Sequence, residues 1–219
     1  MASRPDRSHG LFVLAIATSA ALWWFASGLS PVWWLMWLAP LPILLASVHM
    51  RGRWAALAAF LAFAIGGGNQ WVYLHELIAL PLVTTLLAIA GPGLCFALCT
   101  TLFRRLLLQG RVTLAALALP SLWVALEYIS SLLSPHGTFG NIGYTQMDVL
   151  PVIQIAAVTG IWGIGFLVLL VPATIAALAT PSASQRARLL TIAIAVLLPA
   201  ATLCYGVWRL QAPSLSTTR

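Results

Sequence analysis

Seven long apolar stretches follow one another along the chain, with short polar segments between them. They cover residues 11–29, 32–48, 54–71, 77–103, 112–134, 150–179 and 189–208. A helix needs about 20 apolar residues to cross the roughly 30 Å of hydrocarbon in a bilayer. The pattern therefore predicts an all-α fold, a polytopic membrane protein with about seven transmembrane helices.

Prolines indicate where three of these stretches depart from straight helices. The second stretch is the shortest and contains Pro40 and Pro42, so we expect irregular backbone at its inner end. The fourth and the sixth are longer than a perpendicular span requires. We expect them to tilt, or to kink at Pro92 or Pro172.

Arginine carries the positive charge, because the chain has eleven arginines and no lysine. When the segments between spans are numbered alternately inside and outside, nine arginines fall inside: Arg4, Arg7, Arg51, Arg53, Arg104, Arg105, Arg111, Arg186 and Arg188. Cytoplasmic loops of membrane proteins carry this excess of positive charge. The split predicts a cytoplasmic tail over 1–10, a seven-helix membrane domain over 11–208 and a periplasmic tail over 209–219. The expected location is the bacterial inner membrane.

The composition excludes several other classes of protein. A mean hydropathy of +0.98, with 61% hydrophobic and 7% charged residues, is incompatible with a soluble globular domain. The net charge of +7 lies in short inside loops, beside anionic lipid, so nucleic acid is not an expected partner. Cys95, Cys99 and Cys204 lie in apolar stretches, so we expect no metal site and no cofactor.

Glu127 is the one carboxylate inside a predicted span, since Asp6, Glu76 and Asp148 lie in or beside polar segments. A charge within the membrane costs several kcal/mol unless it is paired, neutral or hydrated. Glu127 is therefore a candidate for function. The alternative, which we weigh equally, is a hydrogen-bonded glutamate that fixes helix packing.

The segment 134–148 is the second candidate, because it places three glycines among polar side chains between two apolar spans. Its His136, Asn141, Tyr144 and Gln146 carry groups that can hydrogen-bond a lipid head group or another domain. Glycines permit tight turns of the backbone there. Composition alone does not separate such a site from an ordinary loop.

The stretch 121–170 resembles a known family. Trp123, Glu127 and Tyr128 precede the loop that ends in Gly143-Tyr144-Thr145-Gln146, and Gln154, Gly160, Gly163 and Phe166 follow it. The order is similar to the membrane part of bacterial apolipoprotein N-acyltransferase, which has Gly-Phe-Pro-Trp and Gly-Tyr-Ser-Gln in its loop. Over 1–120 the likeness is one of topology. Thr138 and Phe139 stand where the family usually has Pro-Trp, which indicates a divergent branch.

The resemblance implies a role in acyl transfer. The full enzyme of the family moves an acyl chain from a phospholipid to its own cysteine, and then to the amino group of a lipoprotein. Its bond-making Glu, Lys and Cys belong to a nitrilase-type domain on the periplasmic side. This chain has no lysine and no cysteine in a polar segment, so we expect no catalytic residue in it. The expected partners are membrane phospholipid, a lipoprotein substrate and a separate nitrilase-type catalytic chain.

We expect substrate or the catalytic domain to bind at Glu127, His136, Asn141, Tyr144 and Gln146. Two alternatives remain open at this point: a non-catalytic membrane scaffold, and a small channel or transporter whose path runs past Glu127. A channel predicts a hydrated cavity within the membrane. The acyltransferase interpretation predicts an outward groove, open to lipid, with the glycine-rich loop at its rim.

The arginine asymmetry yields a topology that reporter fusions can test. Fusions within 49–53, 104–111 and 181–188 should report a cytoplasmic location, and a fusion after Trp208 should report a periplasmic one. A cytoplasmic C-terminus would show that the number of spans is wrong.

Overall fold

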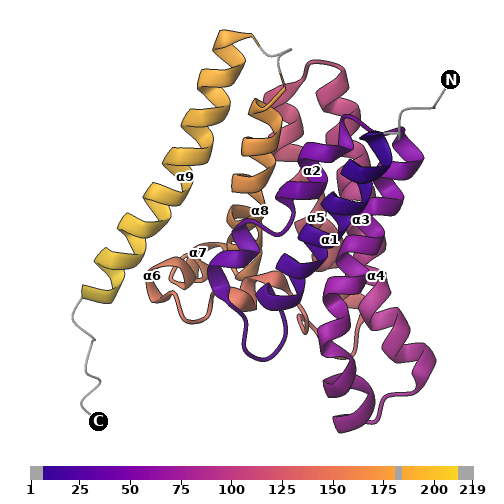
Figure 1. Cartoon of the computed structure of the whole chain (residues 1–219). Helices are drawn as coiled ribbons and strands as arrows, with labels where there is room; N and C mark the ends of the chain where they lie inside the picture. The colour runs from indigo at the N-terminus through magenta and orange to yellow at the C-terminus, as the bar shows by residue number, and fades with distance from the viewer. Residues whose placement is uncertain (1–6, 181–183, 212–219) are drawn as a thin grey trace, which may run out of the picture.

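The computed structural model describes residues 7–180 and 184–211, and these residues form helices and connecting turns without a β-strand (Figure 1). The α-helices are α1 (Arg7–Ala26), α2 (Leu41–Ser47), α3 (Gly52–Gly67), α4 (Leu82–Leu108), α5 (Val112–Leu133), α6 (Leu150–Ile153), α7 (Ala156–Thr159), α8 (Ile161–Leu178) and α9 (Gln185–Gln211). Short helical turns lie between them: η1 (Trp33–Trp37), η2 (Gly68–Gln70), η3 (Val72–Leu77) and η4 (Ile142–Gln146). The predicted all-α fold is confirmed for this part of the chain.

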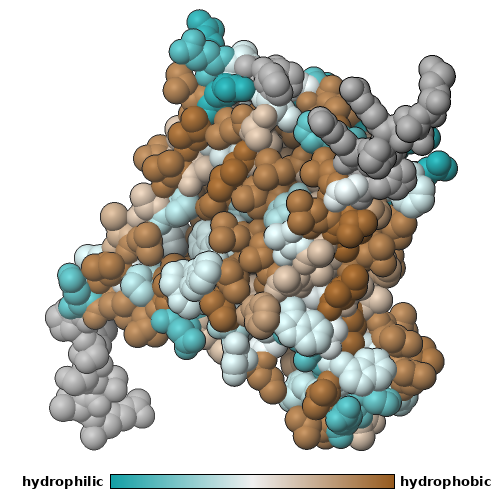
Figure 2. Space-filling view, in the orientation of Figure 1, coloured by the Kyte–Doolittle hydropathy of each residue, from teal (hydrophilic) through white to brown (hydrophobic). Residues whose placement is uncertain are grey.

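Four helices, α4, α5, α8 and α9, are long and apolar enough to cross a membrane. Hydrophobic surface covers the middle of the molecule, and hydrophilic patches gather toward its two ends (Figure 2). The other three apolar stretches hold α1, η1 with α2, and α3. The number of spans and the side on which each end lies stay predictions. Of the predicted tails, residues 1–6 and 212–219 lie outside the described residues.

The prolines act differently from the expectation. The second stretch is irregular at Leu38–Pro40, between η1 and α2, and its inner end is helical. Pro40 and Pro42 lie at the start of α2. Backbone N–H groups in the first turn of a helix have no partner within the helix, so proline, which lacks this group, costs no helical hydrogen bond there. Pro172 lies within an unbroken α8. The sixth stretch instead breaks at Gly160, whose φ of 65° ends α7 and starts α8 in a new direction.

An aromatic cluster between α1, α3, α4 and α5 forms the centre of the core. Trp23 packs on Phe63 with ring centroids 4.5 Å apart, and Phe96 and Trp123 complete the cluster at separations up to 6.3 Å. Tilted and edge-to-face pairs at such distances are favourable arrangements. Gly66 lets α3 approach α1 closely, because a Cβ at this position would collide with the Cβ of Trp23.

Arginines tie the ends of neighbouring helices together at the end of the bundle where α1 and α3 begin. Arg104 of α4 donates to the carbonyl oxygens of Ser47 and Met50, at 2.9 and 2.7 Å, just where α2 ends. Arg188 of α9 donates to the carbonyl oxygen of Thr180, beyond the end of α8, at 2.9 Å. Carbonyls at a helix C-terminus carry partial negative charge and lack helical partners, so these contacts stabilise both helix ends.

The last helix, α9, leans away from the bundle and meets it again at α6 (Figure 1). Where α9 meets α6, Gly206 packs on the backbone of Pro151, and a Cβ at Gly206 would collide with the Pro151 carbonyl oxygen. Thr113 and Thr191 share a hydrogen bond of 2.8 Å between α5 and α9 near the other end. The position of α9 therefore depends on close packing at Gly206 and on hydrogen bonds near both of its ends.

Gly206→Leu should separate α9 from α6 and destabilise the protein by about 1–3 kcal/mol, the usual penalty for overpacking. Thermal unfolding in detergent would measure the loss. Gly91→Leu is the matched control, because nothing lies within 4 Å of a Cβ built at Gly91. Equal stability of the two variants would contradict the described packing of α9.

Candidate functional site

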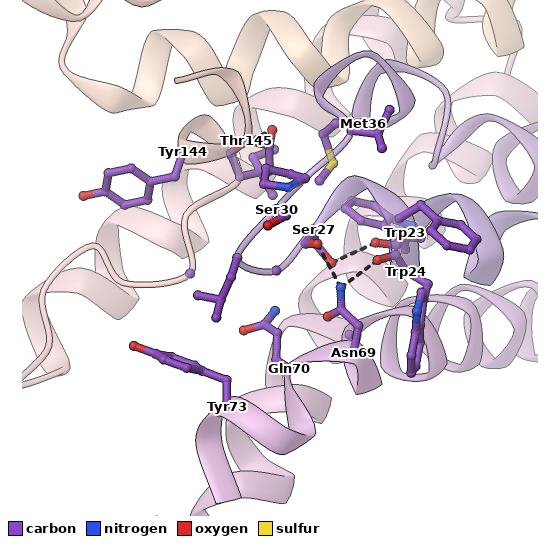
Figure 3. A pocket seen from close by; sticks show the side chains of 18 of the residues that line it. Trp23, Trp24, Ser27, Ser30, Met36, Asn69, Gln70, Tyr73, Tyr144 and Thr145 are labelled. Atoms are coloured by element: carbon purple, nitrogen blue, oxygen red, sulfur yellow. Dashed lines mark hydrogen bonds between the residues drawn. The ribbon is translucent and has the colours of Figure 1, made fainter. Parts of the chain in front are cut away.

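A pocket of about 620 Å³ opens at the end of the bundle where α1 and α3 finish. Three turns form it: residues 27–32 after α1, residues 69–77 after α3, and residues 139–147 of the glycine-rich loop (Figure 3). The arginine-bearing ends of α1 and α3 lie at the opposite end of these helices. The glycine-rich loop thus borders a pocket on the side that the charge pattern assigns to the outside.

The lining of the pocket combines aromatic rings with neutral polar groups. Its polar side chains come from all three turns and include Ser27, Ser30, Asn69, Gln70, Tyr73, Asn141, Tyr144 and Thr145 (Figure 3). None of the 24 described residues that line it is charged. Trp23 is 2% exposed, and its indole N–H has no hydrogen-bond partner among the described residues. The pocket suits a ligand that is partly apolar and offers neutral hydrogen-bond acceptors.

Asn69 shapes one wall by holding the turn that follows α1. Its Nδ2 donates to the carbonyl oxygens of Trp24 and Ser27, at 2.6 and 2.8 Å, where α1 runs out of helical partners. Gly28, with a φ of +92°, passes so close that a Cβ would lie 2.8 Å from Asn69 Nδ2. Asn69 therefore fixes the path of the chain from α1 into the pocket rim.

Glu127 holds the opposite wall of the pocket in place and lies outside the pocket lining. It lies partly buried on α5 and accepts hydrogen bonds from Asn141 Nδ2 at 2.8 Å and from the Ile142 backbone N–H at 3.2 Å. Asn141 in turn accepts from the Gly143 N–H at 2.8 Å, which caps η4. Gly165 of α8 lies beside the carboxyl, with its Cβ position 3.6 Å from Glu127 Oε2, an ordinary van der Waals contact. One carboxyl group thus joins α5 to the glycine-rich loop beside α8.

Gln146 is a second anchor of the loop, and it is fully buried. Its Nε2 donates to the Trp33 carbonyl oxygen at 3.0 Å and to Thr145 Oγ1 at 2.9 Å. Its Oε1 accepts from Trp37 Nε1 at 2.9 Å. These bonds tie η4 to η1 and leave Gln146 with its amide engaged inside the protein.

The five residues predicted from sequence therefore have different positions. Asn141 and Tyr144 line the pocket, and Tyr144 is 42% exposed with its hydroxyl 2.7 Å from Thr138 Oγ1. Glu127 and Gln146 support the loop from outside the pocket lining. His136 is exposed and does not line the pocket.

Sequence reasoning missed the contribution of the turn after α3, which includes Asn69, Gln70 and Tyr73. Asn69 and Gln70 end the apolar stretch 54–71, so an average over that stretch hides them. The adjacent pair of amides was the available signal, since burying an amide costs free energy unless it is hydrogen-bonded.

Comparison with known proteins identifies relatives of this chain. Residues 19–174 match the family described as apolipoprotein N-acyltransferase N-terminal domain, and all three turns of the pocket lie within the match. Over 218 residues the chain is 28% identical to apolipoprotein N-acyltransferase of Geobacter metallireducens, an alignment covering 95% of this chain and 41% of that protein. The chain therefore spans about two fifths of the length of this relative. The family match confirms the resemblance that the motif in 121–170 indicated.

Glu127→Ala should destabilise the glycine-rich loop, because Asn141 Nδ2 and the Ile142 N–H then lose their acceptor. An unsatisfied buried donor costs about 1–3 kcal/mol. Glu127→Gln retains the shape and one acceptor oxygen, so its effect should be smaller. Hydrogen exchange of residues 139–147 and thermal unfolding in detergent would measure both variants.

The control for these variants is Glu76→Ala, which removes an exposed carboxylate outside the pocket lining. Loop exchange and unfolding should match the unsubstituted protein in this control. If Glu127→Ala also matches it, Glu127 does not anchor the loop.

Proposed function

This chain belongs to the family of apolipoprotein N-acyltransferase N-terminal domains, and from that premise we propose that it presents lipid substrates to a nitrilase-type acyl-transfer domain. The substrates are membrane phospholipid and a lipoprotein, held at the pocket formed by residues 27–32, 69–77 and 139–147 in the bacterial inner membrane. The observation that carries the proposal is the pocket itself. It combines aromatic and neutral polar groups at one end of an apolar bundle, within the residues that match the family.

The bond-making groups in this proposal lie outside the 219 residues. Acyl transfer by a Glu, Lys and Cys set needs a lysine, and this sequence contains none. Cys95 and Cys99 lie on α4, and Cys204 lies on α9. None of the three lines the pocket. The nitrilase-type domain would come from another chain or from a further part of a longer protein.

The rim of the pocket is the surface that would face this domain. Tyr73 of η3 and Phe139 of the glycine-rich loop stack with ring centroids 6.3 Å apart and an interplanar angle of 23°. The stack bridges two of the three turns, so it holds the rim in one shape. Leu77 and Tyr144 add exposed area beside it. Aromatic rings and partly exposed apolar groups of this kind are common in the centres of protein interfaces.

The transporter alternative has less support. Its path would run past Glu127, but Glu127 accepts two hydrogen bonds from the loop and does not line the pocket. A carboxyl group that is engaged in this way anchors the loop to α5. We therefore retain lipid presentation as the proposed function.

The test uses the chain in lipid nanodiscs with a phospholipid that carries a diazirine next to its head group. Cross-links should concentrate in 27–32, 69–77 and 139–147. Ser30→Trp should abolish them by filling the pocket, because Ser30 is exposed and lines it. Ser130→Trp is the control, at an exposed position on α5 outside the lining.

Acyl transfer to a lipopeptide should be absent for the 219 residues alone and should appear when a nitrilase-type domain is added. Acyl transfer by the isolated chain would contradict the proposal that the bond-making groups lie outside these 219 residues. Cross-links spread evenly over the lipid-facing helices would contradict lipid presentation at the pocket.

A further inference from the structure

A second hollow lies along the outside of α1. This groove has a volume of about 540 Å³ and is lined almost entirely by apolar atoms. It begins at Val13, passes over Ala17, Ala20 and Ala21, and ends at Trp24 and Phe25. Trp24 and Phe25 also line the pocket. The two hollows therefore share these two aromatic side chains as part of their walls.

The shape of the groove follows from the order of residues on α1. Its lining residues recur at intervals of three and four, so they lie on one face of the helix. The alanines form a low floor between the larger side chains at either end, and Ile65 of α3 adds a side wall. From Val13 to Phe25 the helix rises about 18 Å, slightly more than half of the roughly 30 Å of hydrocarbon in a bilayer. The groove has the length of one leaflet.

The polarity of the two hollows differs in a way that selects a ligand. The groove offers only apolar contact, which suits a hydrocarbon chain. The pocket offers amide, hydroxyl and indole donors without any charged side chain in its described lining. A phosphate would be left there without a cationic partner, which is costly. An ester carbonyl is a neutral acceptor and fits these donors.

We propose that the pocket and the groove bind one ester-linked acyl chain of a membrane lipid. The ester group lies in the pocket, the hydrocarbon chain lies along α1, and the phosphate stays outside the rim. Trp24 and Phe25 mark the point where the ligand changes from polar to apolar. This inference rests on the proposed function and adds to it the path of the chain and the group that is recognised.

The experiment uses the full chain in nanodiscs with two phosphatidylglycerol probes, one with a diazirine beside the head group and one with a diazirine in the middle of an acyl chain. The mid-chain probe should label residues 13–25 of α1. Ala17→Phe and Ala21→Phe should each lower this labelling at least about tenfold, the factor expected from losing the burial of about two methylene groups. Both alanines are exposed, so the larger side chain does not enter the core.

Leu14→Phe is the matched control, because Leu14 lies on α1 with 65% of its side chain exposed and lines neither hollow. Labelling in this variant should equal that of the unsubstituted protein. A diacylglycerol carrying the mid-chain probe should label α1 within about twofold of phosphatidylglycerol, in low and in high salt, because neutral recognition is not screened.

Three outcomes overturn the inference. Diacylglycerol labelling that is weaker by tenfold, or phosphatidylglycerol labelling that falls steeply with salt, would show that the phosphate is recognised. If the head-group probe labels the pocket but the mid-chain probe labels α9 as much as α1, the groove fails and the proposed function stands. If neither probe labels the pocket or the groove preferentially, the proposed function fails as well.

Discussion

Irregular backbone beside an apolar bundle must find its hydrogen-bond partners within the protein, because lipid supplies none. The glycine-rich loop meets this requirement through two side chains. Glu127 takes the donors of Asn141 and Ile142 from the side of α5, and Gln146 joins η4 to η1. The remaining structure at this end of the bundle depends on these two anchors, because they hold the loop against α8 and complete one wall of the pocket.

The other walls are built by the same means from neutral groups. Asn69 satisfies the carbonyl groups at the end of α1 and so turns the chain toward η1. Amide, hydroxyl and aromatic side chains therefore line the pocket. The helices below the pocket are tightly packed, because Gly66 brings α1 and α3 together. Arg104 and Arg188 close helix termini at the opposite end, whereas none of the described residues that line the pocket is charged. The arginines thus predict the orientation of the protein in the membrane, and neutral side chains line the pocket.

Sequence reasoning predicted the parts of this arrangement that follow from local physics. A lone carboxylate in an apolar helix needs a partner, and Glu127 has two. The direction of a side chain is not local, so the sequence could not separate Gln146, which is buried as an anchor, from Tyr144, which faces the pocket. Asn69 was missed because it lies in the apolar stretch 54–71, whose mean hydropathy conceals a single polar residue. The break at Gly160 depends on a positive φ, whereas Pro172 in the same stretch leaves its helix intact.

The wall that the pocket shares with the aromatic cluster has a practical consequence. Trp23 and Phe63 line the pocket and also pack against Phe96 or Trp123 at the centre of the bundle. A ligand that fills the pocket covers the same two rings that hold α1 and α3 together, and it does so only in the folded protein. Occupancy must then raise the melting temperature by mass action. Thermal stability can serve as a detector, so a library of lipids and lipopeptides could be screened on this chain without any knowledge of the reaction it supports.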